Sequence, residues 1–122
     1  MKAQPESMEK LAIQIVESKD SALVCPSGRI DIDSSPSLRD QLLALLRGHI
    51  TMVRVDLTAV TSIDSSAVAT LAEALKIARA GKTELRLQGL HDELLRIFEF
   101  TGLVSLFNGS GDTMIQSGSE AV

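Results

Sequence analysis

The sequence predicts an α/β domain: an open mixed sheet of about four to five strands with helices mainly on one face. The segments 52–57 and 83–88 alternate apolar side chains with polar or charged ones, as a strand does when one of its faces meets water. Apolar residues at helical spacing follow each of these segments, so strands and helices alternate along the chain and imply parallel pairing. A sheet covered on both faces would instead have continuous apolar strands.

The first part of the chain predicts two short strands, at about residues 12–16 and 22–25, and then a helix. Ser35 is the expected N-cap, and Pro36 is the expected first helical residue, where the missing N–H of proline costs nothing. Gly48 is expected to end this helix. The residues that repeat at helical spacing are Leu38, Leu42, Leu45 and Leu46.

The middle of the chain predicts a strand followed by the longest helix. In residues 52–57 the apolar side chains share one face, while Arg54 and Asp56 point to water. The helix extends from about Ser65 to Ala80, and Gly81 ends it. Its predicted buried stripe consists of Val68, Leu71, Ala72, Leu75 and Ala78. The side chains predicted to face away from the domain are Thr70, Glu73 and Lys76.

A strand at 83–88 and a helix from about Asp92 to Phe100 complete the predicted domain, which spans residues 11–107. Segments 1–10 and 108–122 are polar and unpatterned, so we expect them to be flexible, with Met114 and Ile115 touching the sheet edge. Ser65 and His91 would each follow the C-terminal end of a parallel strand, the edge where open α/β sheets place their functional residues.

Composition limits the classes of function. The net charge is -4 and the three aromatic residues are all Phe, so we expect no nucleic-acid partner. The apolar runs are too short to cross a bilayer, and the first ten residues lack the apolar core of a secretory signal. With Cys25 as the only cysteine, these features predict a cytoplasmic protein without membrane insertion. No phosphate-binding loop is present, and Cys25, His49 and His91 lack metal-ligand spacing, so we expect no cofactor.

Three consecutive polar residues, Asp64, Ser65 and Ser66, precede the pattern of the long helix. Asp64 or Ser65 can act as the N-cap, which is the simplest interpretation. One cap needs one side chain, so the extra hydroxyls also suit a modification site: a phosphate there meets the positive end of the helix dipole. A nucleophilic enzyme could use Ser65, His91 and Asp92, but no Gly-x-Ser-x-Gly elbow accompanies them, and we expect no catalysis.

Several short motifs follow one another in a characteristic order along residues 53–107. They are Asp56-Leu57, Asp64-Ser65-Ser66, Gly81 and Thr101-Gly102-Leu103, and Gly28-Arg29-Ile30-Asp31 lies upstream of them. In order and spacing these motifs resemble the STAS domain, the fold of bacterial anti-sigma-factor antagonists, over about residues 11–107. Ala67 departs from the pattern, because the family usually has Gly there, which puts recognition by a kinase in question.

The resemblance implies that Ser65 is the phosphoacceptor of a serine kinase that is also the anti-sigma factor and has a histidine-kinase-like ATPase fold. The unphosphorylated domain would bind this kinase and free the sigma factor. Phosphorylation would release the domain, and a serine phosphatase would reset it, so the chain would regulate transcription by partner switching. The residues that the resemblance places at the partner-binding surface are Asp31, Asp64, Ser66, Ala67, Thr70 and Glu73.

A second group of STAS relatives gives an alternative function. Its members are cytoplasmic subunits that regulate the ATPase of a phospholipid-transport ABC system, and Leu87-Gln88-Gly89-Leu90 resembles that group. They commonly have Thr at the position of Ser65, so Asp64-Ser65-Ser66 favours the antagonists.

Overall fold

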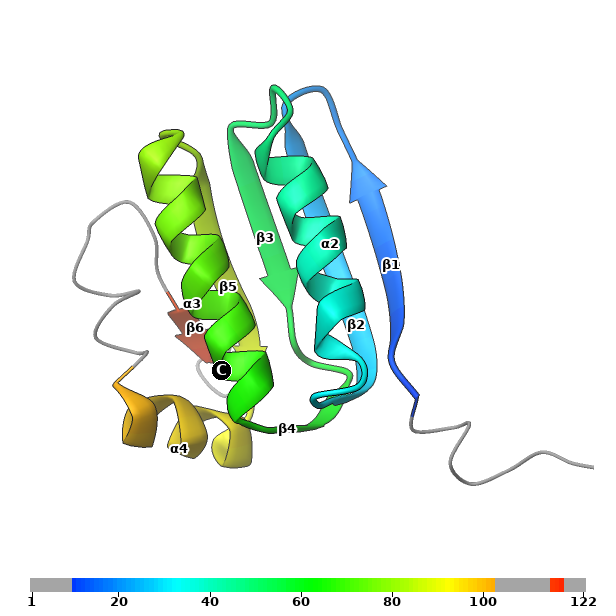
Figure 1. Cartoon of the computed structure of the whole chain (residues 1–122), viewed down its shortest axis with the longest axis vertical. Coiled ribbons are helices and arrows are strands. Elements are labelled where there is room, and N and C mark those ends of the chain that lie inside the picture. The colour runs from blue at the N-terminus through cyan, green and yellow to red at the C-terminus, as the bar shows by residue number, and fades with distance from the viewer. Residues whose placement is uncertain (1–9, 103–114, 118–122) are drawn as a thin grey trace, which may run out of the picture.

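The computed structural model describes residues 10–102 and the short segment 115–117. These residues form one sheet and three helices (Figure 1). The strands are β1 (Ala12–Glu17), β2 (Ser21–Ile30), β3 (Met52–Asp56), β4 (Val60–Ile63), β5 (Glu84–Leu90) and β6 (Ile115–Ser117). The helices are α2 (Ser35–Leu46), α3 (Ser65–Ala80) and α4 (Asp92–Thr101). The segments predicted to be flexible, 1–10 and 108–122, lie outside the described residues except for Lys10 and β6.

The sheet is open and mixed, with the strand order β1-β2-β3-β5-β6, and β4 lies beside the C-terminal end of β2. β1 and β2 form an antiparallel hairpin, whereas the other pairs of described strands are parallel. The helical connections account for the parallel pairing. α2 links β2 to β3 and α3 links β4 to β5, so the strand after each helix runs in the same direction as the strand before it. The predicted mixed sheet is therefore confirmed, and β6, which contains Ile115, pairs with β5 and forms the edge of the sheet.

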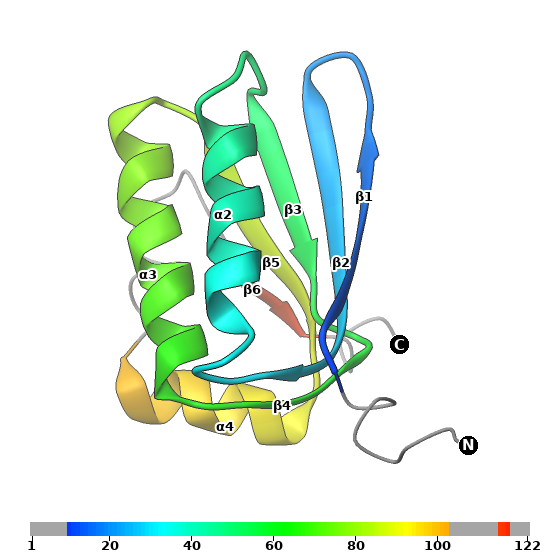
Figure 2. The same ribbon diagram turned by 45° about the vertical axis from the view of Figure 1, so that its right-hand side comes forward.

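The helices α2 and α3 lie side by side on one face of the sheet, and α4 crosses the end at which β4 and β5 finish (Figure 2). Val53 and Val55 of β3 face the helices and are wholly buried, whereas Arg54 between them is exposed on the opposite face. The alternation in the sequence therefore predicted the covered face correctly.

The core between helices and sheet is aliphatic. Leu38 and Leu42 of α2 and Leu71 of α3 are wholly buried, and Phe98 of α4 adds an aromatic ring. Each leucine buried in this way contributes about 1.5–3 kcal/mol. This packing holds the two long helices in a fixed position, and it therefore fixes where both of them begin.

The structure corrects several details of the prediction. The second strand, predicted for residues 22–25, extends over Ser21–Ile30. β4 was not expected as a strand, and α2 has Ser34 rather than Ser35 at its N-cap. The prediction that Thr70 faces away from the domain is wrong, because its exposed fraction is 7%. Ser66 and Glu73, about one turn before and after Thr70, both bond to α2, so Thr70 lies on the side of α3 that packs against α2.

Gly89 allows β5 to pass close to the turn that leads into β4. Its φ is +75°, and a Cβ there would collide with Oγ1 of Thr58 and lie 2.6 Å from a carboxylate oxygen of Asp56. That carboxylate accepts the N–H of Thr58 at 2.9 Å and the amide of Gln88 at 3.2 Å. Burial acts to raise the pKa of Asp56, but hydrogen bonds from the side chain and the N–H of Thr58 and from Gln88 outweigh it, so the pKa lies below its ordinary value. The turn places β4, and β4 leads into the candidate site.

Candidate functional site

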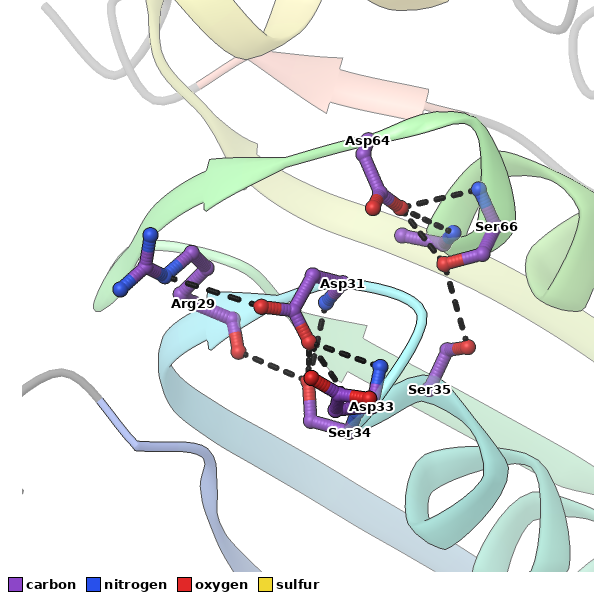
Figure 3. Close-up of polar contacts among 8 residues, drawn as sticks. Arg29, Asp31, Asp33, Ser34, Ser35, Asp64 and Ser66 are labelled. Atoms are coloured by element: carbon purple, nitrogen blue, oxygen red, sulfur yellow. Dashed lines mark hydrogen bonds and ion pairs between the residues drawn. The ribbon is translucent and has the colours of Figure 1, made fainter.

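Two loops leave the sheet side by side and form the candidate site. β2 and β4 are parallel neighbours with Ile30 opposite Ile63, so the residues that follow them share one edge. The N–H of Asp64 donates to the carbonyl of Ile30 at 3.2 Å and joins the two chain segments. α2 begins after one loop and α3 after the other, so the positive ends of two helix dipoles meet here. We call residues 31–35 and 64–67 the helix rim (Figure 3).

Asp64 is the N-cap of α3. Its backbone is extended, with φ -124° and ψ -171°, and its side chain accepts the N–H of Ser66 at 2.9 Å and that of Ala67 at 3.2 Å. The same oxygen accepts the hydroxyl of Ser66 at 2.6 Å. This hydroxyl lowers the pKa of Asp64 below its ordinary value; partial burial opposes the shift, and backbone N–H groups, including that of Ile32, support it. Asp64 therefore stays ionised and starts the helix, as the simplest interpretation of the sequence predicted.

Ser66 connects the two helices of the rim. Besides donating to Asp64, its oxygen accepts the hydroxyl of Ser35, the first residue of α2, at 3.2 Å. Ser35 is buried, with an exposed fraction of 5%, and Ser66 is half-buried. Ser35 was predicted as a cap only, because a bond to a residue 31 positions away leaves no local pattern in the sequence.

Ser65 is held differently from its neighbour. It is the first residue of α3 and is exposed, and its hydroxyl makes no hydrogen bond with any residue that the structure describes. The cap bonds of Asp64 come from the N–H groups of Ser66 and Ala67, so they do not involve Ser65. Its hydroxyl oxygen can therefore be reached by another protein.

Asp31 organises the loop between β2 and α2. Its carboxylate accepts the N–H of Asp33 at 3.0 Å and that of Ser34 at 3.1 Å, and it lies 3.8 Å from the guanidinium of Arg29. The hydroxyl of Ser34 donates to the carbonyl of Arg29 at 3.0 Å. Asp31, Asp33 and Asp64 give the helix rim three carboxylates and no cation of its own, and the cations Arg29 and Lys10 line a pocket together with Asp31 and Asp33.

The other predicted partner-binding residues divide into two groups. Glu73 is half-exposed on α3, and both of its carboxylate oxygens are bound by Arg39 of α2 at 2.8 Å. This hydrogen-bonded pair lowers the pKa of Glu73 and raises that of Arg39. Ala67 and Thr70 are instead buried, so neither side chain can be contacted from outside. The methyl group of Ala67 belongs to the hydrophobic core.

The catalytic interpretation places Ser65 beside His91 and Asp92. His91 precedes α4, and its Nε2 lies 3.0 Å from the carbonyl oxygen of Val60 in β4. No hydrogen bond joins His91 to Ser65 among the described residues, so the base is directed at the backbone of β4. Within the same residues, no group of three His, Cys, Asp or Glu side chains could hold a metal ion. No helix in the described part of the chain has the length and apolar character needed to cross a membrane.

The fold and the helix rim indicate the class of protein to which the chain belongs, and a comparison with known sequences indicates the same class. The sequence profile described as "Mlab, STAS domain" matches residues 13–108. The chain belongs to the STAS domain family.

Named relatives and solved structures have the same type of domain. The chain is 34% identical over 94 residues to the "Anti-sigma-B factor antagonist" of Listeria monocytogenes, covering 76% of this chain and 82% of that protein. An anti-sigma factor antagonist from Mycobacterium paratuberculosis superposes with a TM-score of 0.73 at 20% identity, over 81% of this chain and 84% of that one. The Bacillus cell fate determinant SpoIIAA in its phosphorylated form gives 0.66 at 18% identity, over 90% and 96%. The two solved structures support the fold.

Proposed function

We propose that the chain is an anti-sigma-factor antagonist: a binding module whose helix rim docks on an anti-sigma factor and is switched off by phosphorylation of Ser65. The observation that carries this proposal is the hydroxyl of Ser65 at the first position of α3, which is exposed and makes no hydrogen bond within the described part of the chain. The name of the Listeria relative supports the same function and favours it over regulation of a phospholipid-transport ABC ATPase.

The electrostatics of the helix rim suit a switch. A phosphoserine carries a charge of about -1.5 to -2, and here it would join the carboxylates of Asp31, Asp33 and Asp64. In the free domain this charge faces water and the positive end of the α3 dipole, so the fold tolerates it. In a complex it would be removed from water beside like charges, which costs several kcal/mol. Because each 1.4 kcal/mol weakens binding tenfold, phosphorylation dissociates the complex without unfolding the domain.

The proposed partners follow from this cycle. The anti-sigma factor is a serine kinase of histidine-kinase-like ATPase fold that phosphorylates Ser65, and a serine phosphatase removes the phosphate. The exchange takes place in the cytoplasm, where it releases a sigma factor. The proposed contact surface consists of the exposed and half-exposed residues Asp31, Asp64, Ser65, Ser66 and Glu73. Ala67 and Thr70 are outside this surface because they are buried.

The experiment identifies the partner first and then tests the charge at Ser65. The wild-type chain is used as bait in an extract of the cells that produce it, and the retained protein is identified and purified. We expect a histidine-kinase-like ATPase, which in calorimetric titration binds the variant Ser65→Asp at least tenfold more weakly than wild type. Ser18→Asp is the control, because Ser18 is exposed in the turn before β2, at the opposite end of the sheet. Equal affinity for Ser65→Asp, or retention of an ATPase–permease complex, contradicts the proposal.

A further inference from the structure

The two adjacent serines at the start of α3 have the same chemistry but different surroundings. The hydroxyl of Ser65 is exposed and makes no hydrogen bond with the described residues, whereas that of Ser66 is engaged on both sides. Ser66 donates its proton to Asp64 at 2.6 Å and accepts the proton of Ser35 at 3.2 Å (Figure 3). The first of these bonds is short and ends on a carboxylate, the stronger kind of hydrogen bond.

We infer that these two bonds decide which serine is modified: Asp64 and Ser35 hold the hydroxyl of Ser66 away from the kinase and leave Ser65 as the single acceptor. Asp64 and Ser35 are thus positioning residues for the selection of the acceptor. The inference rests on the proposed function, since it needs a kinase that docks on the helix rim.

The chemistry of the transfer explains why the bonds matter. The serine oxygen forms a new bond to the terminal phosphorus of ATP, the bond from that phosphorus to ADP breaks with its electron pair leaving on ADP, and the hydroxyl proton passes to a base of the kinase. The hydroxyl proton of Ser65 can pass to this base without first breaking a hydrogen bond to a described residue. At Ser66 the proton is held by Asp64, and an oxygen lone pair is used by Ser35, so both bonds must break before the oxygen can attack.

The location of Ser66 further lowers its expected rate of phosphorylation relative to Ser65. Ser66 is directed at the start of α2, where its partner Ser35 is buried, so a phosphate on Ser66 would have to displace that contact. It would also lie against the carboxylate of Asp64, which already contacts the oxygen of Ser66. Loss of a charge-assisted hydrogen bond alone corresponds to a rate at Ser66 roughly tenfold to hundredfold below that at Ser65.

The test first removes Ser65, the preferred acceptor, and then removes one of the two hydrogen bonds that hold the hydroxyl of Ser66. The kinase retained by the wild-type chain is incubated with radiolabelled ATP and with Ser65→Ala, Ser65→Ala/Ser35→Ala or Ser65→Ala/Ser37→Ala, and the phosphorylated residue is identified by mass spectrometry. Ser37 is the matched control, since it lies in the first turn of α2 but is exposed, and no hydrogen bond joins it to Ser66 among the described residues. We expect Ser65→Ala to be phosphorylated at least tenfold more slowly than wild type. Adding Ser35→Ala should raise modification of Ser66 severalfold, and adding Ser37→Ala should not.

Phosphorylation of Ser66 in Ser65→Ala within twofold of the wild-type rate would overturn the inference, as would equal rates for the two double variants.

A measurement without kinase separates this inference from the proposed function. In a double-mutant cycle of Ser35→Ala and Ser66→Ala, the pair should show a coupling of about fivefold in the unfolding equilibrium constant. If the wild-type chain is not phosphorylated at all, the proposed function fails, and the cycle still decides whether Ser35 holds Ser66. Additive effects of the two substitutions would overturn the inference whatever the kinase does.

Discussion

Replacing Asp64 by alanine tests the cap that organises the helix rim. The change removes the acceptor of two backbone N–H groups of α3 and of the Ser66 hydroxyl. Loss of an N-cap costs about 0.5–2 kcal/mol, and the half-buried hydroxyl of Ser66 loses its acceptor as well. We therefore expect the free energy of unfolding to fall by about 2 kcal/mol, which corresponds to roughly 10 °C in Tm for a domain of this size.

The pH dependence of this difference has a definite sign. The pKa of Asp64 is lower in the folded chain than in the unfolded one, so its stabilisation is present above the ordinary carboxyl pKa. It is lost as the pH falls through the folded-state value. The difference between wild type and Asp64→Ala should therefore be complete near neutral pH and shrink below about pH 4.

Urea unfolding followed by far-UV circular dichroism measures the effect, because the chain has no Trp or Tyr for fluorescence. Asp33→Ala is the matched control: Asp33 is an exposed carboxylate of the same rim and caps no helix. It should change the unfolding free energy by less than about 0.5 kcal/mol. If Asp64→Ala is no more destabilising than Asp33→Ala, or if its effect persists unchanged at low pH, the assigned role of Asp64 is wrong.

Three further predictions concern the scaffold. Gly89→Ala should destabilise by about 2–4 kcal/mol in urea unfolding, since a left-handed backbone and a collision with Thr58 combine; an effect below about 1 kcal/mol would contradict it. Arg39→Ala breaks the exposed ion pair with Glu73, so the urea midpoint should move only slightly, and in about 1 M salt not at all; a shift that salt does not reduce would argue against an electrostatic pair. Leu71→Ala should lower the unfolding free energy by about 2–5 kcal/mol, and a smaller loss would show that the site is not tightly packed.

Much of the scaffold could be predicted from local patterns. The alternation in residues 52–57 identified β3 and its wet face, because side chains on a strand alternate between the two faces of the sheet. The predicted bounds of the long helix, 65–80, agree with those of α3, since Asp64 and Gly81 give it a clear start and stop. β4 was missed because its four residues have buried ends and two exposed central positions, which is neither alternating nor continuously apolar.

The details of the site depend on contacts between segments far apart in the sequence. Thr70 was assigned to the outer side of α3 because the apolar stripe identifies only the side that faces the sheet. The packing of α2 against α3 buries a second side of α3, and no local pattern in the sequence indicates this side. For the same reason, the three polar residues Asp64, Ser65 and Ser66 predicted a cap or a modification site but not the division of roles between the two serines. That division comes from Ser35, which only the fold brings next to Ser66.

The most direct test of this account is to locate the phosphate on the wild-type chain. After reaction with its partner kinase and ATP, fragmentation of the peptide that contains residues 61–70 should place a single phosphate on Ser65. A peptide without phosphate, or one with the phosphate on Ser66, would contradict the claim that an exposed hydroxyl at the start of α3 is the switch.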